Sequence, residues 1–193
     1  MKNIYQILFL VHLIHSGCSL FDTEPKPLTP IDAYFYAEIN GEPFNAYSLK
    51  AGVETWRGYS FLEFGGRYYH DEILSYYEQI VFSIIYDDDN NRYQLSVDSS
   101  LTKEIGFRVP LGSYTELEGD VVITRFETPV DSDGFLTVEL TELEDGRKTI
   151  SGTFEMTVYL TERINTSFPQ QEEDTLHITN GRYLMELNDK RDD

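Results

Sequence analysis

The feature that most constrains the fold is a long stretch, residues 149–161, in which polar and apolar side chains alternate without interruption. A period of two is typical of a β-strand with one buried face. A slip of one residue would exchange the two faces, so the apolar set also fixes the register of this strand. Gly152 lies in the middle of the apolar set, and it predicts either a bulge or the close approach of another backbone.

The rest of the chain repeats this pattern in shorter pieces. Alternating or apolar segments predict further strands at residues 33–39, 43–49, 57–64, 80–86, 93–97, 120–126 and 135–140, and a final strand pair or one long bulged strand at 175–187. Asn40-Gly41 predicts a hairpin turn between the first two segments.

Two details follow from the turn residues between these segments. The run 87–91 predicts a turn that joins 80–86 and 93–97 as a hairpin, and the glycines at 65 and 66 are expected to close the third strand. Residues 68–79 are interpreted as a helical turn or a long loop. We therefore predict an all-β domain, an antiparallel β-sandwich or partly open barrel of about eight to ten strands.

The N-terminal residues predict where the protein is located in the cell. Lys2 precedes an apolar run, residues 4–14, of the length of a secretory signal and too short to span a bilayer. Small residues then precede Cys18, the only cysteine. This arrangement resembles the lipobox of bacterial lipoproteins, although His15 stands where the pattern prefers leucine. The resemblance implies cleavage before Cys18 and lipidation of its thiol, and the alternative is an ordinary signal peptide with a free cysteine.

The anchor organises the predicted domains. Residues 1–17 are the signal peptide, 18–31 the lipidated cysteine with a proline-rich tether, 32–188 the β domain and 189–193 a charged tail that is expected to fray. Two or more acyl chains hold a protein firmly on a membrane, whereas one binds only marginally. We expect a lipid-anchored protein of the cell outer membrane.

Charge excludes one class of partner. The chain carries a net charge of −19, and the first 17 residues contain one lysine and no acidic residue. Such a field repels phosphate backbones, so we expect no nucleic-acid partner. The acidic surface is interpreted as a solubility feature, with cation binding as the alternative.

Five short motifs in a fixed order carry a family resemblance. They are AEINGEPF at 37–44, GSY at 112–114, GFLTV at 134–138, TISGTF at 149–154 and ITNGRY at 178–183. The chain resembles the small lipoproteins of Bacteroidetes-type bacteria that carry an all-β domain of unknown function. The resemblance covers most of the chain after the signal, implies an outer-membrane lipoprotein, and supplies no catalytic residues.

Metal sites and catalytic motifs are sparse. Asp87, Asp89 and Asn91 match the first three oxygen ligands of a calcium loop, but Arg92 replaces the glycine that such loops require. The alternative is a polar hairpin tip rich in turn-forming residues. With only two histidines after the signal, a three-histidine zinc site is excluded, and no P-loop or Gly-x-Ser-x-Gly motif is present. We expect no cofactor.

Aromatic residues supply the remaining candidate site. Trp56, Tyr59, Tyr68 and Tyr69, followed by Tyr76 and Tyr77, lie in one third of the chain. Rings exposed on a β-scaffold can stack on sugars, and the alternative is that they cover the second face of a sheet. The sequence thus predicts a non-enzymatic, lipid-anchored accessory or interaction protein with a glycan or protein partner. A carbohydrate-binding surface lipoprotein is the alternative, and a hydrolase without a recognisable motif is the third reading.

Overall fold

Twelve strands and one short helix make up the part of the chain that the computed structural model describes, residues 30–70, 76–106, 108–164 and 173–191. Residues 31–193 form one compact unit. The elements are β1 (Tyr34–Ile39), β2 (Glu42–Asn45), β3 (Ser48–Trp56), β4 (Tyr59–Tyr69), β5 (Tyr76–Ile85), β6 (Arg92–Gln94), α2 (Ser99–Ile105), β7 (Leu111–Glu118), β8 (Val121–Glu127), β9 (Phe135–Thr137), β10 (Glu139–Glu142), β11 (Lys148–Arg163) and β12 (Thr175–Asp189).

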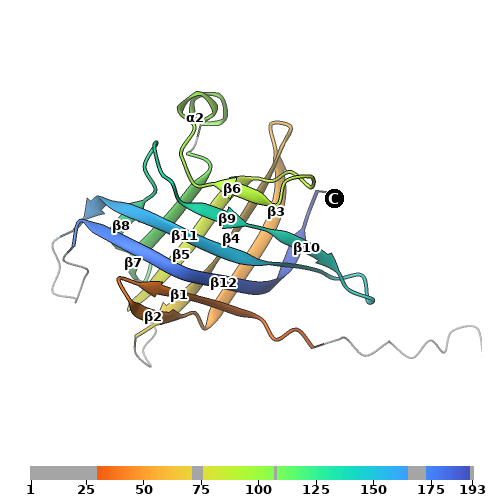
Figure 1. Ribbon diagram of the computed structural model, residues 1–193, viewed down its shortest axis with the longest axis horizontal. Coiled ribbons are helices and arrows are strands. Elements are labelled where there is room, and N and C mark those ends of the chain that lie inside the picture. The colour runs from red at the N-terminus through yellow and green to blue at the C-terminus, as the bar shows by residue number, and fades with distance from the viewer. Residues whose placement is uncertain (1–29, 71–75, 107, 165–172, 192–193) are drawn as a thin grey trace, which may run out of the picture. The chain divides into compact units, whose positions relative to one another are not determined.

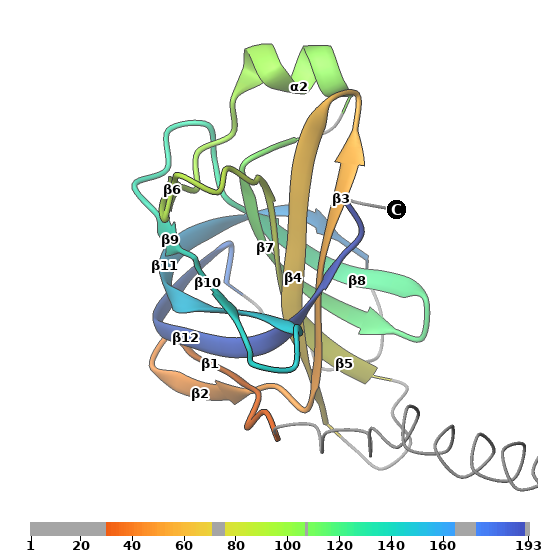
Figure 2. The same cartoon turned by 90° about the vertical axis from the view of Figure 1, so that its right-hand side faces the viewer.

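The strand pairings confirm the predicted fold class. They run β12–β3–β4–β5–β7–β8–β11, and β11 pairs with β12 again, so the sheet closes on itself in a partly closed, barrel-like sandwich. β11 and β12 cross in front of β3, β4 and β5, as Figures 1 and 2 show. β1 and β2 extend the sheet beside β12, and β9, β10 and β6 extend it beside β11.

One pairing is parallel, which differs from the expected all-antiparallel arrangement. Asn188 and Asp189, at the end of β12, pair with Gly52 and Val53 of β3. The other strand pairs are antiparallel. This short seam joins the last strand to the front of the sheet, and it places residue 189, expected in a fraying tail, inside β12.

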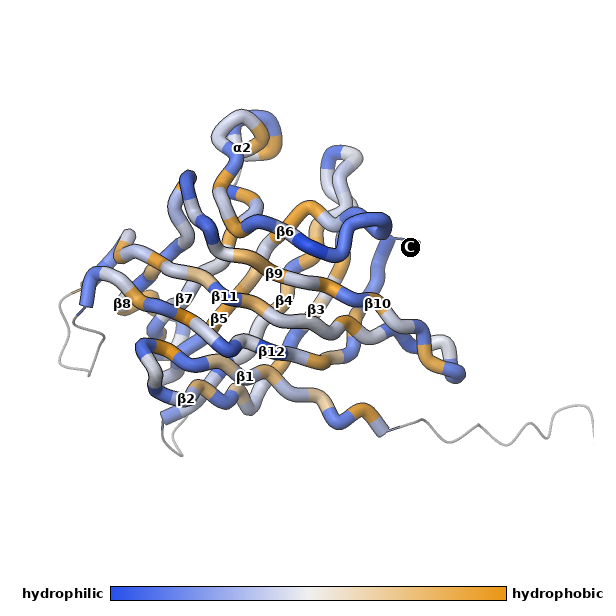
Figure 3. The backbone as a smooth tube through the Cα atoms, viewed as in Figure 1, coloured by the Kyte–Doolittle hydropathy of each residue, from blue (hydrophilic) through white to orange (hydrophobic). Residues whose placement is uncertain are grey.

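Alternation along the strands builds the core between the two layers. Hydrophobic and hydrophilic residues alternate along the tube in Figure 3. Four inward side chains of β11 are buried as its pattern predicts, those of Ile150, Phe154, Met156 and Val158, and Leu160 is half-buried. Aromatic rings from both layers meet in the centre: the ring centroids of Phe64 and Tyr183 are 4.5 Å apart, and those of Phe82 and Phe154 are 4.7 Å apart. Each such pair contributes about 0.5–1.5 kcal/mol beyond its buried area.

Gly152 marks a close approach, as its position predicts. A Cβ there would lie 1.9 Å from the carbonyl oxygen of Thr137. The same oxygen accepts a hydrogen bond of 2.7 Å from the hydroxyl of Tyr183. Because the β9 backbone lies against β11 at this point, only glycine fits.

Several predicted elements need correction. β4 does not end at the glycines but continues through them to Tyr69. β6 pairs with β9 and not with β5, so the expected hairpin of residues 80–86 and 93–97 is wrong. Of residues 68–79, the first two and the last four are in strands, and 71–75 lie outside the described residues. The segment 135–140 forms two short strands, β9 and β10, and the C-terminal segment is one long bulged strand.

The helix α2 was not predicted. Asp98 caps its N-terminus by accepting hydrogen bonds from the backbone of Ser100 and Leu101, at 2.8 and 3.0 Å. Gly106 ends it in the left-handed conformation. An aspartate followed eight residues later by a glycine is a helix signal, and here it was overlooked because the segment lies between strands.

Candidate functional site

The four predicted aromatic ligands do not form one platform. Trp56 and Tyr59 lie at one end of β4 and Tyr68 and Tyr69 at the other. With eleven residues in β4 and a rise of about 3.4 Å per residue, the two pairs are roughly 30 Å apart along the strand. The sequence prediction grouped these four residues only because they are close in the chain.

Three of these rings have structural partners. The hydroxyl of Tyr59 donates to Glu104 Oε1 at 2.7 Å, which ties the β3–β4 hairpin to α2. Tyr68 stacks on Tyr47 with centroids 5.6 Å apart, and Tyr69 contacts Tyr77 at 5.4 Å. These contacts favour the alternative that most of the aromatic residues stabilise the sheet.

Trp56 is the exception. The residue is 55% exposed, and its one ring contact among the described residues is with the guanidinium of Arg57, 5.8 Å from the ring centroid. A large aromatic ring that is mostly exposed at a hairpin tip remains available for a ligand.

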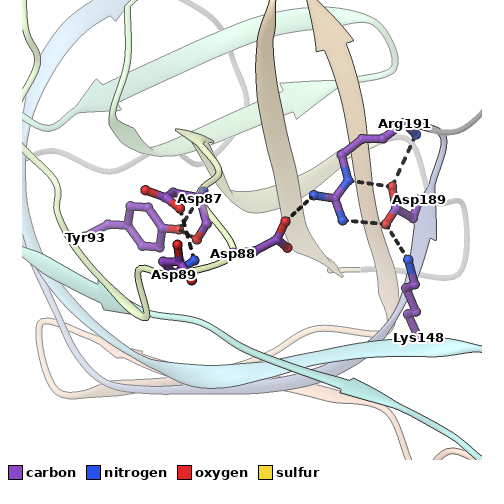
Figure 4. Close-up of polar contacts among 7 residues, drawn as sticks. All are labelled: Asp87, Asp88, Asp89, Tyr93, Lys148, Asp189 and Arg191. Carbon is purple, nitrogen blue, oxygen red and sulfur yellow. Dashed lines mark hydrogen bonds and ion pairs between the residues drawn. The ribbon is translucent and has the colours of Figure 1, made fainter.

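The predicted calcium loop is a turn (Figure 4). Asp87 Oδ1 accepts a hydrogen bond from the backbone of Asp89 at 3.0 Å, and the hydroxyl of Tyr93 donates to the carbonyl of Asp87 at 3.1 Å. The backbone carbonyl of Asn91 accepts from Val138. No group of three or more His, Cys, Asp or Glu side chains suited to a metal ion occurs in the described part of the chain. The residues thus have the roles expected of a polar turn.

Next to this turn lies a group of paired charges, which we call the C-terminal clamp: Asp88, Lys148, Asp189 and Arg191 (Figure 4). Arg191 donates two hydrogen bonds to the carboxylate of Asp189, at 2.7 and 2.9 Å. Lys148 reaches the same carboxylate at 2.9 Å, and Arg191 also reaches Asp88 at 3.0 Å. The clamp fastens the end of β12 beside the parallel seam.

The contacts of the clamp shift the pKa of Asp189, and the pKa of the neighbouring Tyr86 is shifted as well. Hydrogen bonds from Arg191, together with one from Lys148, hold the pKa of the Asp189 carboxyl well below its usual range. The guanidinium of Arg191 also lies 5.3 Å from the ring centroid of Tyr86, where burial, followed by the nearby Asp88, raises the pKa of the phenol to about 12. Every charge of the clamp has a partner, which is the mark of a structural ion-pair group.

A different arrangement lies on the outer face of β3, β4, β5, β7 and β8. Residues of these five strands line a depression of about 460 Å³, which we call the outer hollow. Register places its side chains in rows across the sheet: Ser48, Arg67, Gln79, Thr115 and Arg125 in one, and Lys50, Gly65, Val81, Ser113 and Glu127 in the next. At about 4.8 Å between strands, each row spans roughly 19 Å.

Side-chain length gives the outer hollow its depth. The row through Gly65, Val81 and Ser113 is short, and longer side chains surround it. Gly65 is required in this floor, because a Cβ there would lie 2.2 Å from the carbonyl oxygen of Ile80.

The charged side chains of the outer hollow are weakly paired. Lys50 and Glu63 have no hydrogen bond or ion pair within the described residues. Arg67 bonds the amide of Gln79 at 3.2 Å, and its guanidinium lies 5.0 Å from the ring centroid of Tyr77. The nearest carboxylate oxygen to Arg125 is that of Glu162, at 3.9 Å. Only Glu127 has a close ionic partner, Arg108.

A second depression of about 410 Å³ continues the outer hollow along β3 and β4. The two share Lys50 and Glu63 in their linings, and the second one ends at Trp56. Together they form an elongated groove with the exposed indole at one end.

The opposite layer carries a third depression of about 540 Å³ on β1, β9, β11 and β12. Its polar groups bind one another: Glu38 accepts hydrogen bonds from the hydroxyl of Tyr36 at 3.0 Å and from the amide of Asn180 at 2.9 Å. The guanidinium of Arg182 covers the Tyr36 ring at 4.9 Å. This surface is therefore largely self-satisfied, whereas the outer hollow is not.

Comparisons with known proteins found no match. No family model, no curated protein and no solved structure is similar to this chain. Within the described ranges, no helix is both long and apolar enough to cross a membrane. The predicted lipidation site, Cys18, lies outside the described residues.

The residues of the outer hollow were missed by the sequence analysis. Glu63 lies in the predicted strand 57–64, but Lys50 follows the predicted strand 43–49 and Arg67 follows the glycines that were expected to close the third strand. In the observed strands all three are outward positions, where polar residues are expected on any solvated face. Their convergence depends on the register of five strands, which no local pattern contains.

Proposed function

We propose that this protein is a lipid-anchored lipoprotein of the cell outer membrane whose β domain is non-catalytic and binds a ligand in the outer hollow. The observation that carries the proposal is a pair of charged side chains, Lys50 and Glu63, that have no partner among the described residues and lie in a depression of about 460 Å³. Charged groups that are free of internal partners beside a shaped surface are available to a ligand.

The anchor rests on the sequence. The apolar run, the small residues before Cys18 and the proline-rich segment after it together favour a lipidated N-terminus on a spacer. Replacing Cys18 by alanine should release the protein from membranes or leave the signal uncleaved, whereas Ser19→Ala should change neither. Membrane fractionation with acyl-chain labelling measures this. A Cys18→Ala protein that still takes up label and stays in the membrane would refute the anchor.

The absence of catalysis is supported by the lining. None of the residues that line the outer hollow is histidine or cysteine. The hydroxyl of Ser113 donates to the backbone carbonyl of Val81 at 3.4 Å. A nucleophile needs a base within hydrogen-bond reach, and the lining supplies no such pair for Ser113.

Ligand binding is tested by filling the outer hollow. Ser113→Trp would place an indole over the floor, while Thr141→Trp adds the same group on the exposed β10, outside the hollow. The full-length protein and both variants are applied to an array of bacterial, plant and host glycans and to envelope extracts. We expect Ser113→Trp alone to lose binding. Equal binding by both variants would remove the outer hollow as the site.

Carbohydrate binding is the second candidate, and Trp56 is the observation that favours it. The exposed indole closes the groove that continues the outer hollow, and aromatic rings stack on sugar faces. Trp56→Ala should weaken glycan binding, with Tyr47→Ala, another exposed ring on a different part of the surface, as the matched control. Unchanged glycan binding by Trp56→Ala would remove the ring from the site.

A further inference from the structure

The lining of the outer hollow is positively charged, opposite in sign to the net charge of the protein. The whole chain carries −19, yet the lining of the hollow holds three basic side chains, Lys50, Arg67 and Arg125, against two acidic ones. One of those two acids, Glu127, is neutralised by Arg108 at the edge of the hollow. The hollow is thus a locally positive patch on a strongly negative surface.

The basic side chains in the hollow differ in their pairing from three basic side chains near the end of β12. Arg147, Lys148 and Arg191 each have a carboxylate oxygen within 2.9 Å. Among the described residues, Lys50 and Arg67 both lack a close carboxylate. The ammonium group of Lys50 and the Nη groups of Arg67, whose Nε donates to Gln79, are therefore available to an anionic group of a ligand. Charge-assisted hydrogen bonds of this kind are about twice as strong as neutral ones.

The shape of the groove indicates an extended ligand. The outer hollow and its continuation meet at Lys50 and Glu63, so a ligand that fills both runs along β3 and β4 towards Trp56. The floor of the hollow is made of small side chains and is open to solvent. A chain of flat, linked units fits this surface better than one compact molecule does.

The uncharged groups of the lining indicate hydroxyls on that ligand. Gln79 and Ser113 offer amide and hydroxyl groups that both donate and accept, and the carboxylate of Glu63, which has no partner among the described residues, can accept from hydroxyl groups. The same carboxylate repels a ligand that carries a negative charge on every unit, such as a polyphosphate. The indole of Trp56 offers a face for a sugar ring.

We propose that the outer hollow binds an acidic oligosaccharide, with a sugar carboxylate received by Lys50 and Arg67 and a neighbouring ring stacked on Trp56. This inference rests on the proposed binding function and names the class of its ligand. The carboxylate supplies the anionic partner that both bases lack among the described residues, and the sugar hydroxyls match the mixed donors and acceptors of the floor.

The test compares one sugar with and without its charge. Hexagalacturonate and its fully methyl-esterified form are titrated calorimetrically against the full-length protein in detergent. We expect the acidic form to bind at least tenfold more tightly, and its binding to weaken as salt rises. Equal affinity for the ester would overturn the proposal, as would equal affinity for hexaglutamate, an acidic chain without sugar rings.

Variants locate the charge effect. Lys50→Gln and Arg67→Gln should each weaken hexagalacturonate binding at least tenfold and leave the binding of the ester unchanged. Arg182→Gln should leave both unchanged, because it alters an arginine on the other layer that also has no carboxylate partner among the described residues. Thermal unfolding of each variant checks that it is folded. Full binding by both hollow variants would overturn the proposal.

The two levels of the proposal fail separately. If Ser113→Trp abolishes binding of a neutral glycan or another array ligand while hexagalacturonate does not bind, the outer hollow is the site and the acidic class is wrong. If Ser113→Trp retains all binding, the proposed function fails together with this inference.

Discussion

The outer hollow and the C-terminal clamp use the same kinds of charged residue in opposite ways. In the clamp, Asp189 receives three side-chain hydrogen bonds, and its side chain is 8% exposed. In the hollow, Lys50 and Glu63 lie on neighbouring strands and form no ion pair with each other or with any other described residue.

This difference separates charges that hold the fold from charges that are available to a ligand. Paired, partly buried groups stabilise through hydrogen bonds that are lost on unfolding. Exposed groups without partners add little stability, and they are available to a ligand. The predictions below test this division between the two regions, from the largest expected effect to the smallest.

A substitution in the floor of the outer hollow should lower the stability of the fold far more than one at its rim. In Gly65→Ala, the new Cβ would lie 2.2 Å from the backbone oxygen of Ile80. Since a backbone carbonyl in a strand ladder cannot move aside cheaply, we expect a loss of roughly 3 kcal/mol in the free energy of unfolding, measured by urea denaturation.

The matched control for that substitution lies in the seam beside the clamp. A Cβ at Gly52 would meet only the backbone oxygen of Asn188, at 3.5 Å, an ordinary contact. Gly52→Ala should therefore change stability by no more than about 0.5 kcal/mol. Similar losses in the two variants would mean that the sheet yields at Gly65 and that the floor is not rigid.

The clamp should show the next largest effect. Asp189→Asn removes the charge that Arg191 and Lys148 share, and hydrogen bonds to charged groups contribute about 1.5–3 kcal/mol. We expect a loss of that size at pH 7. In Asp174→Asn, where the carboxylate that contacts Arg163 is 78% exposed, the loss should stay below about 1 kcal/mol. An Asp189→Asn protein as stable as the parent would show that the clamp does not hold the seam.

The stability difference between the parent and Asp189→Asn should depend on pH. Because the pKa of Asp189 is lowered in the folded state, the folded protein binds fewer protons than the unfolded chain, and stability rises with pH in this range. The stability advantage of the parent over Asp189→Asn should be full above about pH 4, the unfolded pKa, and should shrink as the pH falls further. A difference that is constant from pH 7 to pH 3 would contradict the assigned pairing.

The sequence predicted the faces of the strands better than their partners. Ile150, Phe154 and Val158 are buried as the alternation predicts, because the side-chain period is a local property of a strand. Tyr93 was assigned to a hairpin with the strand before it, yet it pairs with Leu136. A polar turn such as 87–91 allows a hairpin but does not select the strand that follows, since packing between distant segments decides the pairing.

The candidate site could be predicted even less. Lys50 of β3 and Ser113 of β7 lie in one row only because β3, β4, β5 and β7 pair in that order and register. Each residue alone indicates nothing beyond an outward position. The aromatic candidates failed for the converse reason: proximity in the chain places Tyr59 and Tyr69 on one strand, but at its two ends.

The smallest stability effect is expected at the rim of the outer hollow. Lys50→Gln and Glu63→Gln each remove a charge that has no partner within the described residues, so the free energy of unfolding should change by less than about 0.5 kcal/mol. Of the two, Lys50→Gln should be the less favourable, because it adds to the excess of negative charge over the chain. Denaturation at low and at high salt measures both terms, since salt screens the second. A loss of more than about 1 kcal/mol in either variant would mean that the rim charges have a structural role after all, and the contrast with Asp189 would no longer distinguish a binding surface from a clamp.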